Sequence, residues 1–319
     1  MRSAGFDLKS LQTVLTLADT GNMTLAARQL GMTQPAVSHA LKTLEEHFGA
    51  ALFDRRLRPL RPTPAGSILI DRARRLLSEA DQIDALVRGS DSNAVPQASI
   101  GLIDSFSATV GPKLIHSLQQ QAQQLLVWSG ISPGLESELL RRSLDFIVSP
   151  NPLEEFNDLE NTLLYREPFV LVLPASESTK TDKITLQTLV ESKPLVRYSR
   201  RSRIGAQIEQ HLRWLRIDAP SRLEFDGTET VIPMVAEGLG WAITTPLCLI
   251  HAKAHLSKLR SLPLPQPELA RSLYLVNHKG EFSDFKKRII KRSGAILRQI
   301  VKDELPTRHR WMAERLKIF

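Results

Sequence analysis

This chain of 319 residues has a single cysteine, Cys248. One cysteine can form neither an intramolecular disulfide nor a cysteine-based metal cluster, which fits a reducing compartment. No run approaches the roughly 20 apolar residues that a membrane-spanning helix needs, and the N-terminus lacks an apolar stretch of signal-peptide length. We therefore expect a soluble, cytoplasmic protein without a membrane partner.

Motifs of the common enzyme and cofactor sites are also missing. There is no Gly-x-Gly-x-x-Gly, no phosphate-binding P-loop and no His-Glu-x-x-His, and the histidines are scattered without ligand spacing. Cys248 lies in the apolar run Pro-Leu-Cys-Leu-Ile, which favours a buried structural thiol over a nucleophile. We expect no enzymatic activity, no metal and no cofactor.

Positive charge, in contrast, is in excess. The formal net charge is +8 and the isoelectric point is near 9.7, values compatible with a nucleic-acid partner. Much of the excess lies between Lys286 and Lys317. By itself this stretch indicates a solvated surface, so we expect a basic C-terminal tail over residues 306–319.

The most informative stretch is Thr24 to Gly49, which predicts two short helices joined by a three-residue turn. The first helix spans Thr24 to Leu30 and is closed by Gly31, where a left-handed conformation costs glycine nothing. The second begins after Thr33, a helix-capping residue, with Pro35 in its first turn. Its apolar residues recur at helical spacing and predict a buried face of Val37, Leu41, Leu44 and Phe48.

The opposite face of the second helix is polar, as in a recognition helix that enters the major groove of DNA. Ala51 to Phe53 then predicts a short strand, followed by an arginine-rich loop that resembles a basic wing. The open alternative is an ordinary helical hairpin with a solvated polar face. The candidate DNA-binding residues are Thr33, Gln34, Pro35, Ser38, His39, Lys42, Arg55, Arg56, Arg58 and Arg61.

Phe6 to Gly66 resembles the winged helix-turn-helix of LysR-type transcriptional regulators. The resemblance rests on Ala26-Ala27, Leu30-Gly31, Thr33-Gln34-Pro35-Ala36-Val37-Ser38, Leu44-Glu45, Gly49, Leu52-Phe53, Arg55, Thr63 and Ala65-Gly66. His39 and Pro62 depart from the family pattern. The resemblance implies a DNA-binding domain over residues 1–63.

Thr63 and Pro64 predict the start of a long helix that reaches Val87. Its apolar residues alternate spacings of four and three, which is typical of a heptad seam that pairs with a second helix. The alternative is that the seam packs on its own domain. Gly89 to Pro96 then predicts a hinge, so residues 64–92 form a dimerising linker with the seam Leu69, Ala73, Leu76, Ala80, Ile83 and Val87.

Beyond the hinge, short apolar strands alternate with helices, which favours an α/β fold with largely parallel sheets. Strands are predicted at Ser99 to Ile103, Leu125 to Trp128, Phe146 to Ser149, Phe169 to Leu173, Leu195 to Tyr198, Trp241 to Thr244 and Leu273 to Asn277. Helices are predicted at Thr109 to Gln121, Leu135 to Arg142, Ile204 to Leu215, Thr230 to Glu237 and Phe285 to Val301.

This half resembles the effector-binding domain of the same regulators, which is similar in fold to periplasmic binding proteins. The resemblance implies an effector-binding domain over residues 93–305. Its subdomain I would comprise residues 93–166 and 268–305, and its subdomain II residues 167–267, with crossings near Arg166 and Pro267.

A small molecule would bind beyond the C-terminal ends of the strands, where helix N-termini favour anions. Serine and threonine at these places are also plain helix caps. We expect Arg197 to clamp a carboxylate and Asp104 or Glu229 to meet a hydroxyl or amino group, unless Arg197 pairs with one of these acids instead. The candidate effector-binding residues are Asp104, Ser105, Phe106, Ser107, Trp128, Ser129, Ser149, Arg197, Tyr198, Thr228 and Glu229.

These features together predict a ligand-responsive, sequence-specific DNA-binding transcription factor. We expect it to bind a double-stranded DNA operator as a homodimer or homotetramer and, if it is an activator, to contact RNA polymerase. Two alternatives remain open. One is a constitutive repressor whose C-terminal half only assembles the oligomer, and the other is a solute-binding protein or enzyme with an incidental helix pair.

Overall fold

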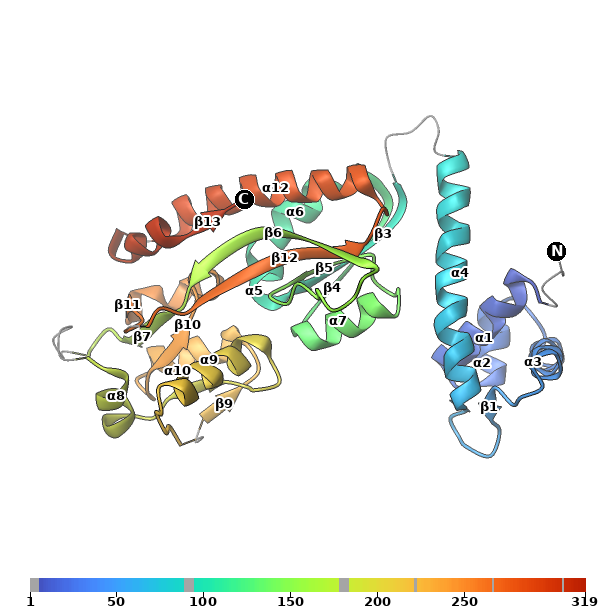
Figure 1. Ribbon diagram of the computed structural model, residues 1–319, viewed down its shortest axis with the longest axis horizontal. Coiled ribbons are helices and arrows are strands. Elements are labelled where there is room, and N and C mark those ends of the chain that lie inside the picture. Colours follow the sequence, from blue (N-terminus) through green and yellow to red (C-terminus); the bar gives the residue numbers. More distant parts are fainter. Residues whose placement is uncertain (1–5, 89–94, 178–183, 221–222, 266, 306) are drawn as a thin grey trace. The chain divides into compact units, whose positions relative to one another are not determined.

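The computed structural model describes residues 6–88, 95–177, 184–220, 223–265, 267–305 and 307–319 (Figure 1). It divides into an N-terminal unit, which extends to Asn93, and a C-terminal unit, which begins at Ala94. Each unit has a hydrophobic core of its own. The hinge predicted at Gly89 to Pro96 falls mostly outside the described residues.

The N-terminal unit is built on three helices, α1 (Leu8–Thr20), α2 (Met23–Gln29) and α3 (Gln34–Phe48). The predicted helix pair is confirmed: Thr33 caps α3 by accepting the Ala36 N–H at 3.4 Å, and Gly31 has a φ of +62°. Val37, Leu41 and Leu44 are buried as predicted. Phe48 is not, because it lies in the last turn of α3, where it is 42% exposed and contacts the ring of Phe6.

A two-stranded ribbon follows α3. The strand predicted at Ala51 to Phe53 is shorter than expected, since β1 (Phe53–Asp54) pairs antiparallel with β2 (Arg61–Pro62). The next helix packs closely against the residue before β1: a Cβ on Gly66 would lie 1.9 Å from the Leu52 carbonyl oxygen. Glycine is therefore required at this position.

The long helix α4 (Pro64–Arg88) is confirmed, and the Thr63 hydroxyl caps it by accepting the Gly66 N–H at 3.1 Å. Its predicted seam divides into two parts. Ala73 is fully buried in the unit, where α4 packs on α1. Leu76 and Ile83, further along, are 44% and 63% exposed. The first part of the seam thus packs on its own domain, whereas Leu76 and Ile83 are exposed and can meet a partner helix.

The C-terminal unit consists of two lobes (Figure 1). Lobe I contains a six-stranded sheet in the order β13-β6-β12-β5-β3-β4. Its strands are β3 (Val95–Ile103), β4 (Ala122–Gly130), β5 (Phe146–Ser149), β6 (Leu159–Pro168), β12 (Ala270–His278) and β13 (Lys317–Ile318). Its helices are α5 (Asp104–Thr109), α6 (Gly111–Leu118), α7 (Ser132–Leu140) and α12 (Ser283–Glu304).

Lobe II contains a three-stranded sheet in the order β10-β7-β11 and a strand pair β8-β9, bridged by Leu195 and Trp241. Its strands are β7 (Val170–Pro174), β8 (Val196–Tyr198), β9 (Leu223–Phe225), β10 (Ala242–Thr244) and β11 (Leu259–Pro263). Its helices are α8 (Leu186–Ser192), α9 (Arg203–Trp214), α10 (Thr228–Ala236), α11 (Pro246–His251) and the 3-10 helix η3 (Lys253–Lys258).

The two lobes are connected by a ribbon of β6 and β12, which pair antiparallel along their whole length (Figure 1). The prediction of largely parallel sheets is therefore wrong. Only β3 with β4, β3 with β5, and β8 with β9 are parallel among the named strand pairs of the described residues. In the C-terminal unit, β6, β9, β11 and β13 have no counterpart among the predicted strands. Polar residues such as Glu160, Asn161 and Arg166 interrupt the apolar pattern of β6.

The C-terminal segment is also different from the expected solvated tail. The 3-10 helix η4 (Thr307–Arg315) packs on the core, where Met312 is fully buried and His309 is 1% exposed. Strand β13 then pairs antiparallel with β6. The His309 Nδ1 atom and the Ser261 hydroxyl of β11 are 2.6 Å apart, so this segment joins lobe I to lobe II.

Candidate functional sites: a DNA-binding face and an interlobe cavity

The polar face of α3 is accessible. Thr33, Gln34, Pro35, His39 and Lys42 are exposed and Ser38 is half-buried. Gln34, Ser38 and Lys42 recur every four residues, so helical geometry places their side chains along one side of α3, off the buried face. This is the arrangement that a recognition helix needs in order to reach base edges.

All four arginines of the segment around β1 and β2 are exposed, but they differ in their partners. Arg55 donates to the Glu45 carboxylate at 2.6 Å, and Arg56 pairs with Asp54 through two hydrogen bonds. Among the described residues, Arg58 and Arg61 have no carboxylate partner. These two cations are thus available to phosphates without breaking an internal contact.

A cavity of about 50 Å³ lies between lobes I and II. The residues that line it include Asp104, Ser105 and Ser132 from lobe I, and Tyr198, Ser202, Arg203, Thr228 and Cys248 from lobe II. Arg271, from the connecting strand β12, completes the lining. Burial raises the pKa of Asp104, and the nearby charge of Glu229 raises it further. The cavity is therefore rich in hydroxyl groups and contains charges of both signs.

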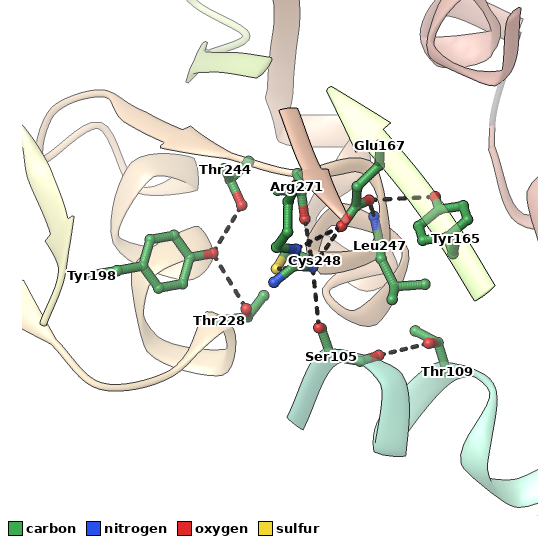
Figure 2. Close-up of polar contacts among 11 residues, drawn as sticks. Ser105, Thr109, Tyr165, Glu167, Tyr198, Thr228, Thr244, Leu247, Cys248 and Arg271 are labelled. Carbon is green, nitrogen blue, oxygen red and sulfur yellow. Dashed lines mark hydrogen bonds and ion pairs between the residues drawn. The ribbon is translucent and has the colours of Figure 1, made fainter. Parts of the chain in front are cut away.

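Arg271, which lines the cavity, belongs to a buried ion pair that Figure 2 shows. Arg271 donates to Glu167 from its Nε atom at 3.0 Å and from an Nη atom at 2.5 Å, and the two residues are 3% and 0% exposed. Burial alone lowers the pKa of Arg271, but the Glu167 charge raises it above the ordinary value, so the arginine stays charged. Arg271 also donates to Ser105 of lobe I at 3.4 Å and to Thr245 of lobe II at 3.0 Å.

Tyr198 forms a second buried group on the lobe II wall (Figure 2). Its hydroxyl lies 2.8 Å from the Thr244 hydroxyl and 3.2 Å from that of Thr228. Burial raises the pKa of Tyr198 well above its ordinary value, so the phenol stays neutral. The Thr228 hydroxyl, at the first turn of α10, is thereby held beside the cavity.

A further ion pair joins the two lobes at the cavity. Arg203, in the first turn of α9, donates to the Glu136 carboxylate of α7 at 2.7 Å. Ser149 and Asn151 also donate to Glu136, at 2.9 and 3.2 Å. The Ser149 hydroxyl, which was a candidate ligand group, is therefore engaged inside the protein.

Of the candidate effector-binding residues, Asp104, Ser105, Tyr198 and Thr228 line the cavity. Arg197 does not: it is 4% exposed and pairs with Glu209 of α9, so it is neither the expected clamp nor a partner of Asp104 or Glu229. Phe106 is a fully buried core residue. The candidates Ser107, Trp128, Ser129 and Glu229 are also outside the cavity lining.

Sequence reasoning missed Arg271, Glu167 and Arg203. Arg271 and Glu167 lie beside the crossings that were expected near Arg166 and Pro267, and each is a charge beside an apolar strand. Such a charge signals a buried ion pair, but only the pairing of β6 with β12 places Glu167 opposite Arg271.

Within the described residues, no three His, Cys, Asp or Glu side chains are grouped so that they could hold a metal ion. None of the helices described is both long and apolar enough to cross a membrane.

Comparison with known proteins agrees with this architecture. Residues 8–67 match the family model "Bacterial regulatory helix-turn-helix protein, lysR family", and residues 94–286 match "LysR substrate binding domain". The chain belongs to the LysR family. LysR-family regulators combine a DNA-binding and an effector-binding domain, and this chain has both.

Two relatives in this family cover most of the chain. The uncharacterized HTH-type transcriptional regulator YbhD of Escherichia coli is 27% identical over 285 residues, which is 86% of each chain. A probable nitrogen assimilation transcriptional activator of Synechococcus elongatus is 28% identical over 277 residues, 84% of this chain and 88% of its own. Both relatives are named as transcriptional regulators.

Solved full-length LysR-type structures share the fold. A full-length OxyR variant from Pseudomonas aeruginosa superposes with a TM-score of 0.72 at 21% identity, and the match covers 91% of this chain and 95% of that one. CbnR in complex with its target DNA gives a TM-score of 0.62 at 17% identity, with 91% and 100% covered. At these identities the likeness establishes the fold of this LysR-family chain.

Proposed function

We propose that this LysR-family regulator binds operator DNA as a homodimer or homotetramer in the cytoplasm, and that a small polar carboxylate modulates this binding. The observation that carries the effector part is the interlobe cavity, because hydroxyl groups of both lobes and the buried Arg271 line it. A ligand that touches both lobes binds one lobe arrangement better than another, which is the requirement for shifting an equilibrium.

The DNA-binding part of the proposal rests on α3 and the arginines beside it. Gln34, Ser38 and His39 would read bases in the major groove, while Arg58 and Arg61 would contact phosphates. Leu76 and Ile83 on the exposed part of α4 would pair with a second copy, which supplies the second recognition helix that a two-fold operator needs. If the protein is an activator, the assembled oligomer would then contact RNA polymerase.

The chemistry of the cavity favours an acid that carries a hydroxyl or amino group. Thr228, Ser105 and Arg271 would donate to the carboxylate, so that Arg271 takes the role first expected of Arg197. Asp104, which no hydrogen bond or ion pair satisfies within the described residues, would accept from the hydroxyl or amino group. A pure anion would leave this carboxylate opposed to a like charge.

Thermal unfolding of the purified protein against a panel of small hydroxy, amino and simple carboxylic acids tests the effector assignment. A true effector at 100 times its Kd adds about 2.7 kcal/mol to the free energy of unfolding. We expect Thr228→Val and Ser105→Ala to lose most of that gain. The matched control is Ser107→Ala, because Ser107 lies on α5 like Ser105 but does not line the cavity. If no acid stabilises the protein, or if the three variants respond alike, the cavity assignment is wrong.

A second test separates base readout from phosphate contact. The protein selects a duplex from a random library, and each variant is titrated against that duplex and against random-sequence DNA. Ser38→Ala or Gln34→Ala should cost about 1 to 3 kcal/mol on the selected duplex only. Arg58→Ala should weaken both duplexes equally and lower the salt slope by about 0.9. Equal losses on both duplexes for Ser38→Ala would remove it from base readout.

A further inference from the structure

Glu45 of α3 ties the recognition helix to the segment that follows it. Its Oε1 atom accepts the backbone N–H of Leu52 at 2.9 Å, and its Oε2 atom accepts from Arg55 at 2.6 Å. The Glu45 side chain is 15% exposed, whereas that of Arg55 is 51% exposed. Both hydrogen bonds involve a charged group and are therefore stronger than neutral ones.

These hydrogen bonds lie at both ends of β1. Leu52 immediately precedes the strand and Arg55 immediately follows it. The other backbone group of Leu52, its carbonyl, accepts the Thr63 N–H at 3.0 Å. The arginine-rich loop comprises residues 55–61, that is, the connection from β1 to β2 together with Arg61, the first residue of β2. The start of this loop is held by Glu45 on one side, and Leu52 is held by the start of α4 on the other.

The same loop bears Arg58 and Arg61, the two arginines of this loop that lack a carboxylate partner in the described residues. A donor that is already held where the phosphate will be loses less conformational entropy on binding, so its contact contributes more to affinity. A loop tied to α3 keeps a fixed offset between these two arginines and the recognition helix.

We propose that Glu45 is a positioning residue for DNA recognition. It touches no DNA itself; it holds the arginine-rich loop at a fixed distance from α3, so that Arg58 and Arg61 meet phosphates while α3 lies in the major groove. This inference rests on the proposed DNA-binding function and adds to it a residue that acts only through the loop.

The sign of the effect makes the proposal testable. Removing a negative charge near DNA should, on electrostatics alone, tighten binding. Releasing the loop should weaken it. Glu46 provides a matched control, because it is the next residue of the same helix and its carboxylate forms an exposed pair with Lys42 at 3.5 Å.

The experiment titrates the full-length protein against the duplex that the wild type selects from a random library, over a range of salt concentrations. Glu45→Ala should lower the affinity about tenfold or more and reduce the salt slope by about 0.9 for each phosphate that is no longer neutralised. Glu46→Ala should bind as tightly as the wild type or slightly more tightly. Far-UV circular dichroism at the assay temperature verifies that each variant is folded.

A double-mutant cycle distinguishes positioning from general loosening of the domain. Arg61→Ala should lose much less DNA-binding free energy in the Glu45→Ala background than in the wild type, since the loop is already released. Ser38→Ala should lose the same DNA-binding free energy in both backgrounds. Glu45→Gln keeps an acceptor for the Leu52 N–H, and its affinity should fall between those of wild type and Glu45→Ala.

Two results would overturn the proposal: wild-type affinity or better with an unchanged salt slope for Glu45→Ala, or equal costs of Arg61→Ala in both backgrounds. Should Glu45→Ala not fold, Glu45→Gln decides by the same criterion of affinity and slope. If instead the wild type selects no duplex, it is the proposed DNA-binding function that fails.

Discussion

The buried ion pair between Arg271 and Glu167 should dominate the stability of the C-terminal unit. Glu167 is fully buried and accepts four hydrogen bonds: two from Arg271, one from the Leu247 N–H at 2.9 Å and one from the Tyr165 hydroxyl at 3.3 Å. Removing one member of such a pair leaves a buried charge without its partner, which costs about 3 to 5 kcal/mol. We expect that loss for Arg271→Met and for Glu167→Gln.

Urea unfolding followed by tryptophan fluorescence measures this loss in the right part of the molecule. All four tryptophans, Trp128, Trp214, Trp241 and Trp311, belong to the C-terminal unit. At a slope of about 2 to 3 kcal/mol/M, the midpoint should fall by about 1 to 2.5 M urea. The fluorescence therefore reports the unit that contains the ion pair and is silent for the helix-turn-helix.

The double variant supplies the decisive comparison. When both charges are removed, no unpaired charge remains, so the combined loss should be no larger than that of either single variant. Losses below about 1 kcal/mol for the single variants, or additive losses in the double variant, would show that water or other groups compensate the charges. The ion pair would then not be the main stabilising interaction of the C-terminal unit.

Three further outcomes are expected. Met312→Ala should lower the free energy of unfolding by about 2 to 5 kcal/mol in the same urea assay, because this side chain is fully buried. An unchanged free energy of unfolding would indicate that the C-terminal segment is a solvated tail after all. Leu76→Glu should dissociate the oligomer in sedimentation velocity, and an unchanged profile would exclude the exposed seam as an interface. Burial raises the pKa of Asp145, so wild-type stability should fall relative to Asp145→Asn as pH rises through that pKa. In acid, where both side chains are neutral, the difference in stability between the two proteins should no longer change with pH, and urea midpoints that run parallel at all pH values would contradict the prediction.

Local signals made the N-terminal unit predictable from the sequence. Thr33, Gly31, Thr63 and Pro64 act within one turn of a helix, and each sets a boundary that the structure confirms. Phe48 was misplaced because helical spacing identifies a face but not where the core ends along the helix. Its exposure depends on Phe6 and on the length of α3, which are tertiary properties.

The interlobe cavity was only partly predictable, because the sequence does not show which charged residues become ion-pair partners when they are far apart along the chain. Asp104 and Ser105 follow β3, Tyr198 ends β8 and Thr228 begins α10, so the rule that ligands meet strand ends and helix N-termini found them. Arg197 obeys the same rule, but its neighbour in space is Glu209, twelve positions away on α9. Arg271 lies more than one hundred residues from Glu167, and no periodicity in the sequence relates the two.

The placement of β13 has a practical consequence for handling the protein. Lys317 and Ile318 cover the outer edge of β6, and the Phe319 N–H donates to the Leu164 carbonyl at 3.1 Å. A strand edge left uncovered is a template for pairing with another chain. Shortening the chain by its last few residues, or appending an affinity tag there, would strip or crowd this cover and invite self-association, so expression vectors should carry any tag at the other terminus.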